Sequence, residues 1–254
     1  MKGNSTWLKQ LGALLLWLIL WHLLSLRLHQ EILLVSPLKV LQRLSQLCGE
    51  SSFWLAVGNS LRRILLGFAL ACVGGIILAA ASLHPFVYTV LAPVLSLMKA
   101  TPVASVTILV LFWVPSSNLA VVIAFMMVLP IIYYNVYEGL HQVDKQLLEM
   151  AAVFRLSPWK RIRYLITPSV LPYFISACSV GFGQAWKSGI AAEVIALPRQ
   201  SIGINLYNAK VYLSNADLLA WTVVIVLLSL AMEKTLLLLM ARSGLGGLSN
   251  GHSN

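Results

Sequence analysis

Residues 149–173 form a polar interruption of the chain that is long and patterned enough to bind a partner. At its start, apolar side chains recur at helical spacing: Leu147, Met150, Ala151 and Phe154. This spacing predicts a short helix with one apolar face. Because the sequence offers that face no obvious core to enter, we expect it to bind another protein chain.

A second helix start follows directly in the sequence. Ser157 can serve as its N-cap, and Pro158 suits the first helical position because its missing N–H costs nothing there. The sequence therefore predicts two short helices that meet at an elbow. The basic residues Lys160, Arg161 and Arg163 beside an apolar run are typical of the cytoplasmic side of a membrane.

Polar side chains also interrupt the apolar run 171–197: Ser176, Ser179, Gln184, Lys187, Ser188 and Glu193. In a membrane such residues must face protein or water, so Ser179, Gln184, Lys187 and Glu193 are candidates for a translocation path. Lys187 and Glu193 are roughly 9 Å apart along a helix, so direct pairing is not expected. We expect Lys187 on the path or at a dimer seam, where it would favour an anionic solute. We expect Glu193 to meet a basic or amide group of a neighbouring helix; the alternative is that both reach for lipid headgroups.

The run 87–114 is too long for one uninterrupted span and contains Pro93 and Pro102. Each proline removes a helical hydrogen bond, so we expect a broken or kinked helix whose freed backbone groups face protein or a cavity. Lys99 and Thr101 lie between the two prolines and are further candidates for the path. Snorkelling of Lys99 to a membrane interface is an equally open interpretation.

No motif in the sequence indicates an enzyme. The pattern G-x-x-x-x-G-K-[ST] is absent, and the glycines at 244, 246 and 247 lack the strand and helix of a phosphate-binding loop. No Ser/His/Asp constellation or pair of carboxylates stands out. The three cysteines are widely separated and the five histidines lack metal-ligand spacing, so no disulfide, metal or cofactor is predicted.

The composition indicates an integral membrane protein. Hydrophobic residues make up 59% of the 254 residues and charged residues 10%, with a mean hydropathy of +0.85, which a soluble domain of this size could not hide from water. The chain has room for about six spans of ~20 residues. The net charge is +10, but the basic residues lie at the ends of apolar runs and do not form one polar face, which argues against a nucleic-acid surface.

We expect spans over residues 11–26, 64–81, 87–114, 119–136, 171–197 and 218–240, with the first retained and not cleaved as a signal peptide. Residues 36–52 are predicted to be a polar extracytoplasmic connection, and 115–118 a turn. Residues 198–215 should contain a helix with one apolar face: Ile202, Leu206, Ala209 and Leu213. That face could lie on the membrane surface, against a dimer partner, or in the core.

Glycines in two of the expected spans suit close helix packing: Gly67, Gly74, Gly75, Gly181, Gly183 and Gly189. The basic residues Lys2, Lys9 and Arg242 place both termini in the cytoplasm, together with the loop 138–163. Arg62 and Arg63 count against this orientation, because it puts them on the outer side.

The loop resembles the coupling loop of bacterial ATP-binding-cassette (ABC) importer permeases, which reads E-A-A, three residues, G, nine residues, then I-x-L-P. Four residues are in register with it: Glu149, Ala151, Leu165 and Pro168. Three positions differ from it: Met150 and Arg155 replace Ala and Gly, and Thr167 replaces Leu. Arg155 is the important departure, because glycine permits φ > 0 at the elbow and a long side chain resists it. The Ser157–Pro158 start offers a turn further downstream instead.

Other segments are similar to the nitrate, sulfonate and taurine branch of these permeases: SLRRILLGF, LLEMAAVF, LPYF and AWKSGIAAEVI. The resemblance covers residues 53–240. It implies an all-α, polytopic membrane protein with about six transmembrane helices in the type I importer permease (MetI-like) fold. An N-terminal helix and its connection (1–52) would precede the permease core (53–242, coupling loop 139–165), and a disordered cytoplasmic tail (243–254) would follow.

The resemblance also implies the partners: a second permease copy, two ABC ATPase subunits, and an extracytoplasmic substrate-binding protein. The implied ATPase-coupling residues are Glu149, Met150, Ala151, Val153, Phe154, Arg155 and Leu156. Among them we expect Glu149 to cap the helix or pair within the loop. The implied solute is a small anion; a thiamine-precursor-like compound, another small organic solute, or an ATP-independent secondary transporter are the alternatives.

Overall fold

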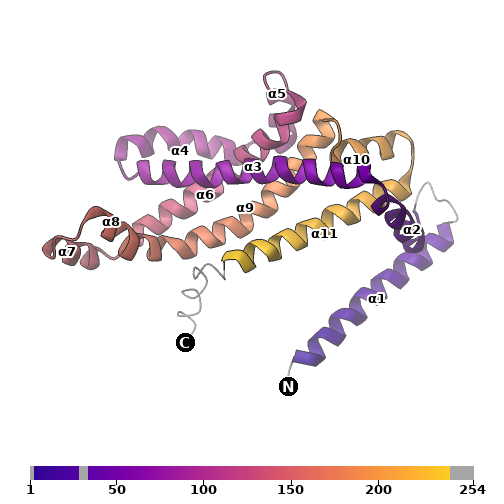
Figure 1. The fold of residues 1–254 in the computed structure, drawn as a ribbon, viewed down its shortest axis with the longest axis horizontal. Helices are drawn as coiled ribbons and strands as arrows, with labels where there is room; N and C mark the ends of the chain where they lie inside the picture. Colours follow the sequence, from indigo (N-terminus) through magenta and orange to yellow (C-terminus); the bar gives the residue numbers. More distant parts are fainter. Residues whose placement is uncertain (1–2, 29–33, 241–254) are drawn as a thin grey trace.

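The structure, a computed structural model, describes residues 3–28 and 34–240, and every regular element in these ranges is a helix. Five helices are long: α1 (Gly3–Leu28), α3 (Ser51–Ala81), α6 (Ser116–His141), α9 (Thr167–Ala196) and α11 (Asn215–Met240). The shorter ones are α2 (Pro37–Cys48), α4 (Pro85–Ala100), α5 (Val103–Val110), α7 (Lys145–Val153), α8 (Pro158–Arg161) and α10 (Ile202–Val211). Helices α7 and α8 lie at one end of the bundle, and α2 and α10 lie at the other (Figure 1).

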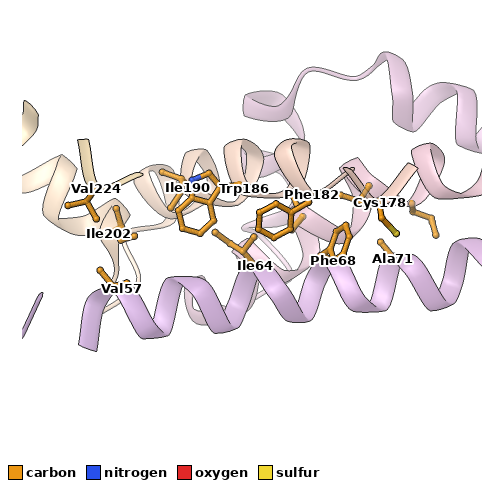
Figure 2. Packing of buried hydrophobic residues seen from close by; sticks show 14 of the residues in the cluster. Val57, Ile64, Phe68, Ala71, Cys178, Phe182, Trp186, Ile190, Ile202 and Val224 are labelled. Carbon is orange, nitrogen blue, oxygen red and sulfur yellow. The ribbon is translucent and has the colours of Figure 1, made fainter. Parts of the chain in front are cut away.

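The core lies where α3, α6 and α9 pack along one another. Ile64, Val128 and Phe182 come from these three helices and are at most 1% exposed. Phe182 also meets Phe68 edge-to-face, with ring centroids 5.6 Å apart. Figure 2 shows such side chains pointing from α9 toward α3. These three helices therefore form the part of the protein that holds the remaining elements in place.

Small residues bring the core helices together, as the sequence predicts. A Cβ atom added to Gly67 of α3 would lie 2.4 Å from the carbonyl oxygen of Val121 in α6, so the two backbones approach more closely than any side chain permits. A Cβ atom on Gly189 of α9 would lie 2.6 Å from Ile64. Gly183 has nothing within 4 Å of the same position, so its predicted packing role is not met within this chain.

Four helical segments are long and apolar enough to cross a membrane: Ser51–Ala81, Ser116–His141, Pro158–Ala196 and Asn215–Leu236. The pair α4 and α5 passes the same test as one span bent by 106°. Leu15–Arg27 of α1 is a shorter apolar helix. These six segments correspond to the six runs expected from the sequence.

The expected break in the third span lies at one proline and not at both. Pro93 stands inside α4, whereas the helix ends at Ala100 and restarts at Val103, after Pro102. α4 packs against α6, and in Figure 1 its C-terminal end is level with the middle of α3 along the long axis of the bundle. The bend therefore falls about halfway along the bundle, on its exposed side.

Three connections differ from the predictions. Residues 36–52 are not a mere connection, because Pro37–Cys48 form α2, whose Arg43 pairs with Asp217 of α11. The predicted turn at 115–118 is the first turn of α6, and the chain turns over residues 111–115 instead. In α10, Ile202 and Ala209 are buried in the core, whereas Leu213 lies beyond the end of the helix and is 67% exposed. Of the three roles considered for this apolar face, the structure shows core packing. The predicted tail (243–254), Lys2 and Arg242 lie outside the described residues.

Candidate functional site

The elbow predicted from residues 149–173 projects from the end of the bundle at which α6 ends (Figure 1). Its first helix, α7, starts at Asp144, whose carboxylate oxygen accepts a hydrogen bond of 2.8 Å from the backbone N–H of Gln146. Asp144 therefore caps the N-terminus of α7, a role that we expected Glu149 to play. Glu149 itself is exposed, and within the described ranges its side chain makes no ion pair or hydrogen bond.

The turn of the elbow is at Arg155, where the coupling-loop pattern has glycine. Arg155 has φ of 46°, in the left-handed region, so the prediction that the turn moves downstream is wrong. The N–H of Leu156 donates to the carbonyl of Ala151 at 2.9 Å, and the N–H of Arg155 to that of Ala152 at 3.1 Å. These two bonds are the Schellman motif that ends many helices, usually around a glycine. The chain thus keeps the turn and accepts a Cβ atom in it.

A second basic residue completes the elbow, and the sequence reasoning missed its role. Arg161 of α8 donates from Nε to the carbonyl of Leu156 at 3.1 Å and from Nη2 to that of Ala151 at 3.4 Å. A cation near a helix C-terminus is favourable both for the unpaired carbonyls and for the helix dipole. Arg161 therefore holds α7 against α8, whereas the sequence indicated only membrane orientation for it.

The second helix of the elbow is longer than expected. Pro158–Arg161 continue through a π-helical segment, Ile162–Ile166, into α9, so residues Pro158–Ala196 form one helical segment of 39 residues. The elbow is thus joined directly to the helix that carries Lys187 and Glu193. A displacement of α7 and α8 can reach the core through a single helix.

The exposed face of the elbow is apolar. Val153 is 79% exposed and Phe154 72%, and Trp159, which the sequence analysis did not single out, is 69% exposed. Met150 is about half exposed, but Ala151 is only 1% exposed and faces the inside of the elbow. We define the elbow surface as Met150, Val153, Phe154 and Trp159. Large apolar side chains gathered at a tip in this way are typical of a surface that contacts another protein or the membrane.

Glu193, a candidate for the path, is fully buried near the opposite end of the bundle. Its carboxylate accepts hydrogen bonds from Ser60 Oγ at 2.6 Å and from the N–H of Gly203 at 3.3 Å, and it pairs with Arg63 Nη1 at 3.2 Å. The prediction that Glu193 meets a basic group on a neighbouring helix is confirmed. The group joins α3, α9 and α10, and we call Ser60, Arg63, Glu193 and Gly203 the Glu193 clasp.

The other candidates for the path fall into two separate groups. Ser179, Gln184 and Lys187 lie along α9, where Lys187 is exposed and the other two are partly buried. Lys99 and Thr101 lie at the bend between α4 and α5, where Thr101 Oγ1 donates to the carbonyl of Leu97 at 2.6 Å. Their place on a path stays a prediction. Among the described residues, no group of three His, Cys, Asp or Glu side chains could hold a metal ion.

Comparison with known proteins gives a family and several relatives. Residues 71–240 match the family described as "Binding-protein-dependent transport system inner membrane component". The taurine transport system permease protein of Escherichia coli K12 is 25% identical over 87% of this chain and 83% of its own length. A bicarbonate transport system permease protein of Synechocystis is 28% identical over 62% of this chain, a match that spans 56% of that protein.

Two solved structures share the fold. One, described as an amino acid ABC transporter with histidines, aligns with a TM-score of 0.61 at 15% identity, over 74% of this chain and 94% of its own. The other, an inward-facing methionine ABC transporter, aligns with a TM-score of 0.51 at 14% identity, over 72% and 92%. The all-helical, polytopic architecture with its bent span is thus that of type I ABC importer permeases.

Proposed function

Because this chain belongs to the family of binding-protein-dependent transport system inner membrane components, a multi-pass permease of the inner membrane, we propose that it forms the path for a small anionic solute and couples that path to separate ABC ATPase subunits. The family is a transport family, and the energy for transport would come from ATP hydrolysis by the partner chain. A second permease copy and an extracytoplasmic binding protein complete the proposed assembly.

The observation that carries the proposal is the elbow surface at the tip of α7 and α8. Phe154 and Val153 lie at the turn, and neither has a place in the core of this chain. Exposed aromatic anchors of this kind fill pockets in partner proteins and supply much of the binding energy. Because α8 continues into α9, a partner held at this tip would pull directly on a helix of the core.

We place the elbow on the cytoplasmic side, where an ATPase would meet it. Lys160, Arg161 and Arg163 gather at this end, in agreement with the excess of basic residues that marks cytoplasmic loops. At the other end, Arg63 is bonded to Glu193, whereas Arg62 is exposed and counts against this orientation. Both described termini then point the same way, with α2 and α10 outside.

The anionic solute is proposed from the relatives and from the charge of the chain. The printed names of two relatives state taurine and bicarbonate, whereas a third, 26% identical, states riboflavin, so a different small organic solute is the alternative. Lys99 and Lys187 are exposed cations within predominantly apolar helices. A cation in a low-dielectric passage favours an anion. Ser179, Gln184 and Thr101 would add polar contacts along the same passage.

Reconstitution tests the proposal. The full chain is co-expressed with candidate ABC ATPase and binding-protein subunits, and the purified complex is placed in proteoliposomes loaded with ATP. Uptake of labelled taurine, nitrate or bicarbonate should require ATP and both partners. Uptake by the chain alone, driven by an ion gradient, would instead identify a secondary transporter, and failure of the ATPase to co-purify would remove the coupling role of the elbow.

A further inference from the structure

Polar and aromatic side chains line one side of the bent span, and the functional site described above uses only one of them. Ser96 Oγ and Tyr134 Oη lie 3.1 Å apart, and Lys99 Nζ lies 5.9 Å from the centre of the Tyr134 ring. Toward the elbow end of α4, Tyr88 stacks on Tyr137 with centroids 5.1 Å apart. We call Tyr88, Ser96, Lys99 and Tyr134 the α4–α6 polar face.

These residues lie on one side of α4. At 3.6 residues per turn, positions 88, 96 and 99 fall within about 80° of one another around the helix, and Val94 lies about 150° from their mean direction. Tyr88, Ser96 and Lys99 are all exposed in the chain, as is Val94. One exposed side of α4 is therefore polar, and the opposite exposed side is apolar.

The depth of this face makes its polarity costly. Lys99 is in the last turn of α4, roughly 21 Å along the helix from Pro85, and the chain then bends by 106° away from the direction of the span. In Figure 1 this end of α4 is level with the middle of α3 along the long axis of the bundle. A cation and hydroxyl groups at such depth are stable only beside protein or water.

Within the described ranges, neither of the ion pairs Arg43–Asp217 and Arg63–Glu193 involves Lys99, and no carboxylate neutralises it. Along α6, Glu138 comes four residues after Tyr134, and its carboxylate accepts a hydrogen bond of 2.8 Å from Gln142. Lys99 instead lies over the Tyr134 ring, a cation–π arrangement that brings no negative charge to its ammonium group. The face therefore presents one uncompensated positive charge beside two hydroxyl groups.

We propose that the α4–α6 polar face is the solute-binding wall of the translocation path, wetted by water, and that it binds the solute as an oxyanion. Lys99 supplies the charge. Ser96 and Tyr134 are hydrogen-bonded to each other, so one of these two hydroxyl groups has a free proton to donate to an oxygen atom of the solute. Charge-assisted hydrogen bonds from a cation and hydroxyl groups are the contacts that carboxylate, sulfonate and nitrate groups share. This inference rests on the proposed transport function and assigns its specificity to α4 and α6.

The test uses cysteine chemistry, so that it is independent of transport. In a chain with Cys48, Cys72 and Cys178 replaced by alanine, Ser96→Cys and the matched control Val94→Cys are introduced separately. The assembled complex is treated with an anionic and with a cationic methanethiosulfonate reagent, both membrane-impermeant. Cysteine reacts with these reagents only in water, so position 96 should react at least tenfold faster than position 94.

The charge is tested in the same background. At position 96, the nearby Lys99 should speed the reaction with the anionic reagent relative to that with the cationic one. Lys99→Gln should lower this anionic-to-cationic rate ratio by about fivefold or more. Lys99→Arg should retain the ratio. Equal reactivity at positions 96 and 94, or a ratio unchanged in Lys99→Gln, would overturn the inference.

Uptake by the reconstituted complex separates the two proposals. If the parental complex takes up none of the labelled anions, the proposed function fails, whatever the labelling shows. If the parental complex transports and Lys99→Gln does so with the same rate and concentration dependence, only the oxyanion wall fails. We expect Lys99→Gln to raise the half-saturating anion concentration while the complex still assembles, and Lys99→Arg to restore it.

Discussion

Arg155 adopts a backbone conformation that costs free energy for any residue with a Cβ atom. Left-handed φ values cost L-residues about 1–2 kcal/mol, a cost that glycine avoids. The two Schellman hydrogen bonds and the contacts of Arg161 hold the turn in place despite this. The elbow of this permease is thus built without the glycine of the family pattern, and its neighbours provide the restraint.

Arg155→Gly should therefore stabilise the elbow. We expect a gain of about 1 kcal/mol in local stability, seen as slower hydrogen exchange at the amides of Arg155 and Leu156. Arg155→Ala is the control, because it removes the long side chain and keeps the Cβ atom, and it should show no gain. Equal protection in both variants would mean that the side chain, and not φ, sets the stability of the turn.

Phe154→Ala should weaken binding of the ATPase without unfolding the chain. Phe154 is 72% exposed, so its removal leaves no cavity, whereas truncating an aromatic anchor of an interface costs roughly 2 kcal/mol of binding or more. The measurement is retention of the ATPase on the purified permease. Tyr212→Ala, 78% exposed and next to α10 at the opposite end, should retain the ATPase fully. Full retention by Phe154→Ala would remove this residue from the interface.

At the scale of elements, the Glu193 clasp joins α3, α9 and α10. Glu193 is 0% exposed and the Arg63 side chain 13%, so removing one partner leaves the other charge buried and unpaired. Such a change typically costs about 3–5 kcal/mol. We expect Glu193→Ala to lower the thermal stability of the solubilised permease strongly. Arg63→Ala in the same chain should recover part of the loss.

Asp217→Ala is the matched control for the clasp, because Asp217 also pairs with an arginine at this end. The side chains of Arg43 and Asp217 are 34% and 24% exposed, so water screens them, and the loss should be below about 1 kcal/mol. Equal losses in the two variants would contradict the role of burial. The clasp also explains why Arg63 can lie on the outer side: it serves as the partner of a buried carboxylate.

The contact of α3 with α6 depends on Gly67. Gly67→Ala places a Cβ atom 2.4 Å from a backbone oxygen, which cannot move aside as a side chain can, so the two helices must separate. We expect lower thermal stability by a few °C or more. Gly58→Ala in the same helix has nothing within 4 Å and should be neutral or stabilising, because alanine is the better helix former. A harmless Gly67→Ala would show that the helices have room to move apart.

At the scale of the whole molecule, the elbow and α2 lie at opposite ends of the bundle. A membrane-impermeant maleimide added to intact cells should label the native Cys48, which is exposed at the end of α2, and should not label Lys160→Cys. After permeabilisation both should react. Labelling of position 160 from outside would invert the topology and remove the elbow from the cytoplasm.

Much of this architecture could be predicted from the sequence alone, because membrane spans and helix starts are local properties. Runs of apolar residues indicate the spans, Ser157–Pro158 predicts a helix start, and Pro102 predicts a break. Pattern and composition suffice there, since in a bilayer each backbone must satisfy its own hydrogen bonds within a helix. The coupling-loop pattern likewise identified the permease class, because its residues lie close together in the sequence.

The tertiary structure decided what depends on contacts between distant residues. Ser60 and Arg63 are more than 100 residues from Glu193, Lys99 meets Tyr134 across two helices, and the positive φ of Arg155 is held by Arg161. A sequence lists such groups without stating which of them meet, because burial and pairing arise only when the helices pack. For that reason the sequence determined that this chain spans the membrane and belongs with importer permeases. Only the packed bundle decided which charges are paired and buried, such as Glu193, and which are exposed, such as Lys99 and Lys187.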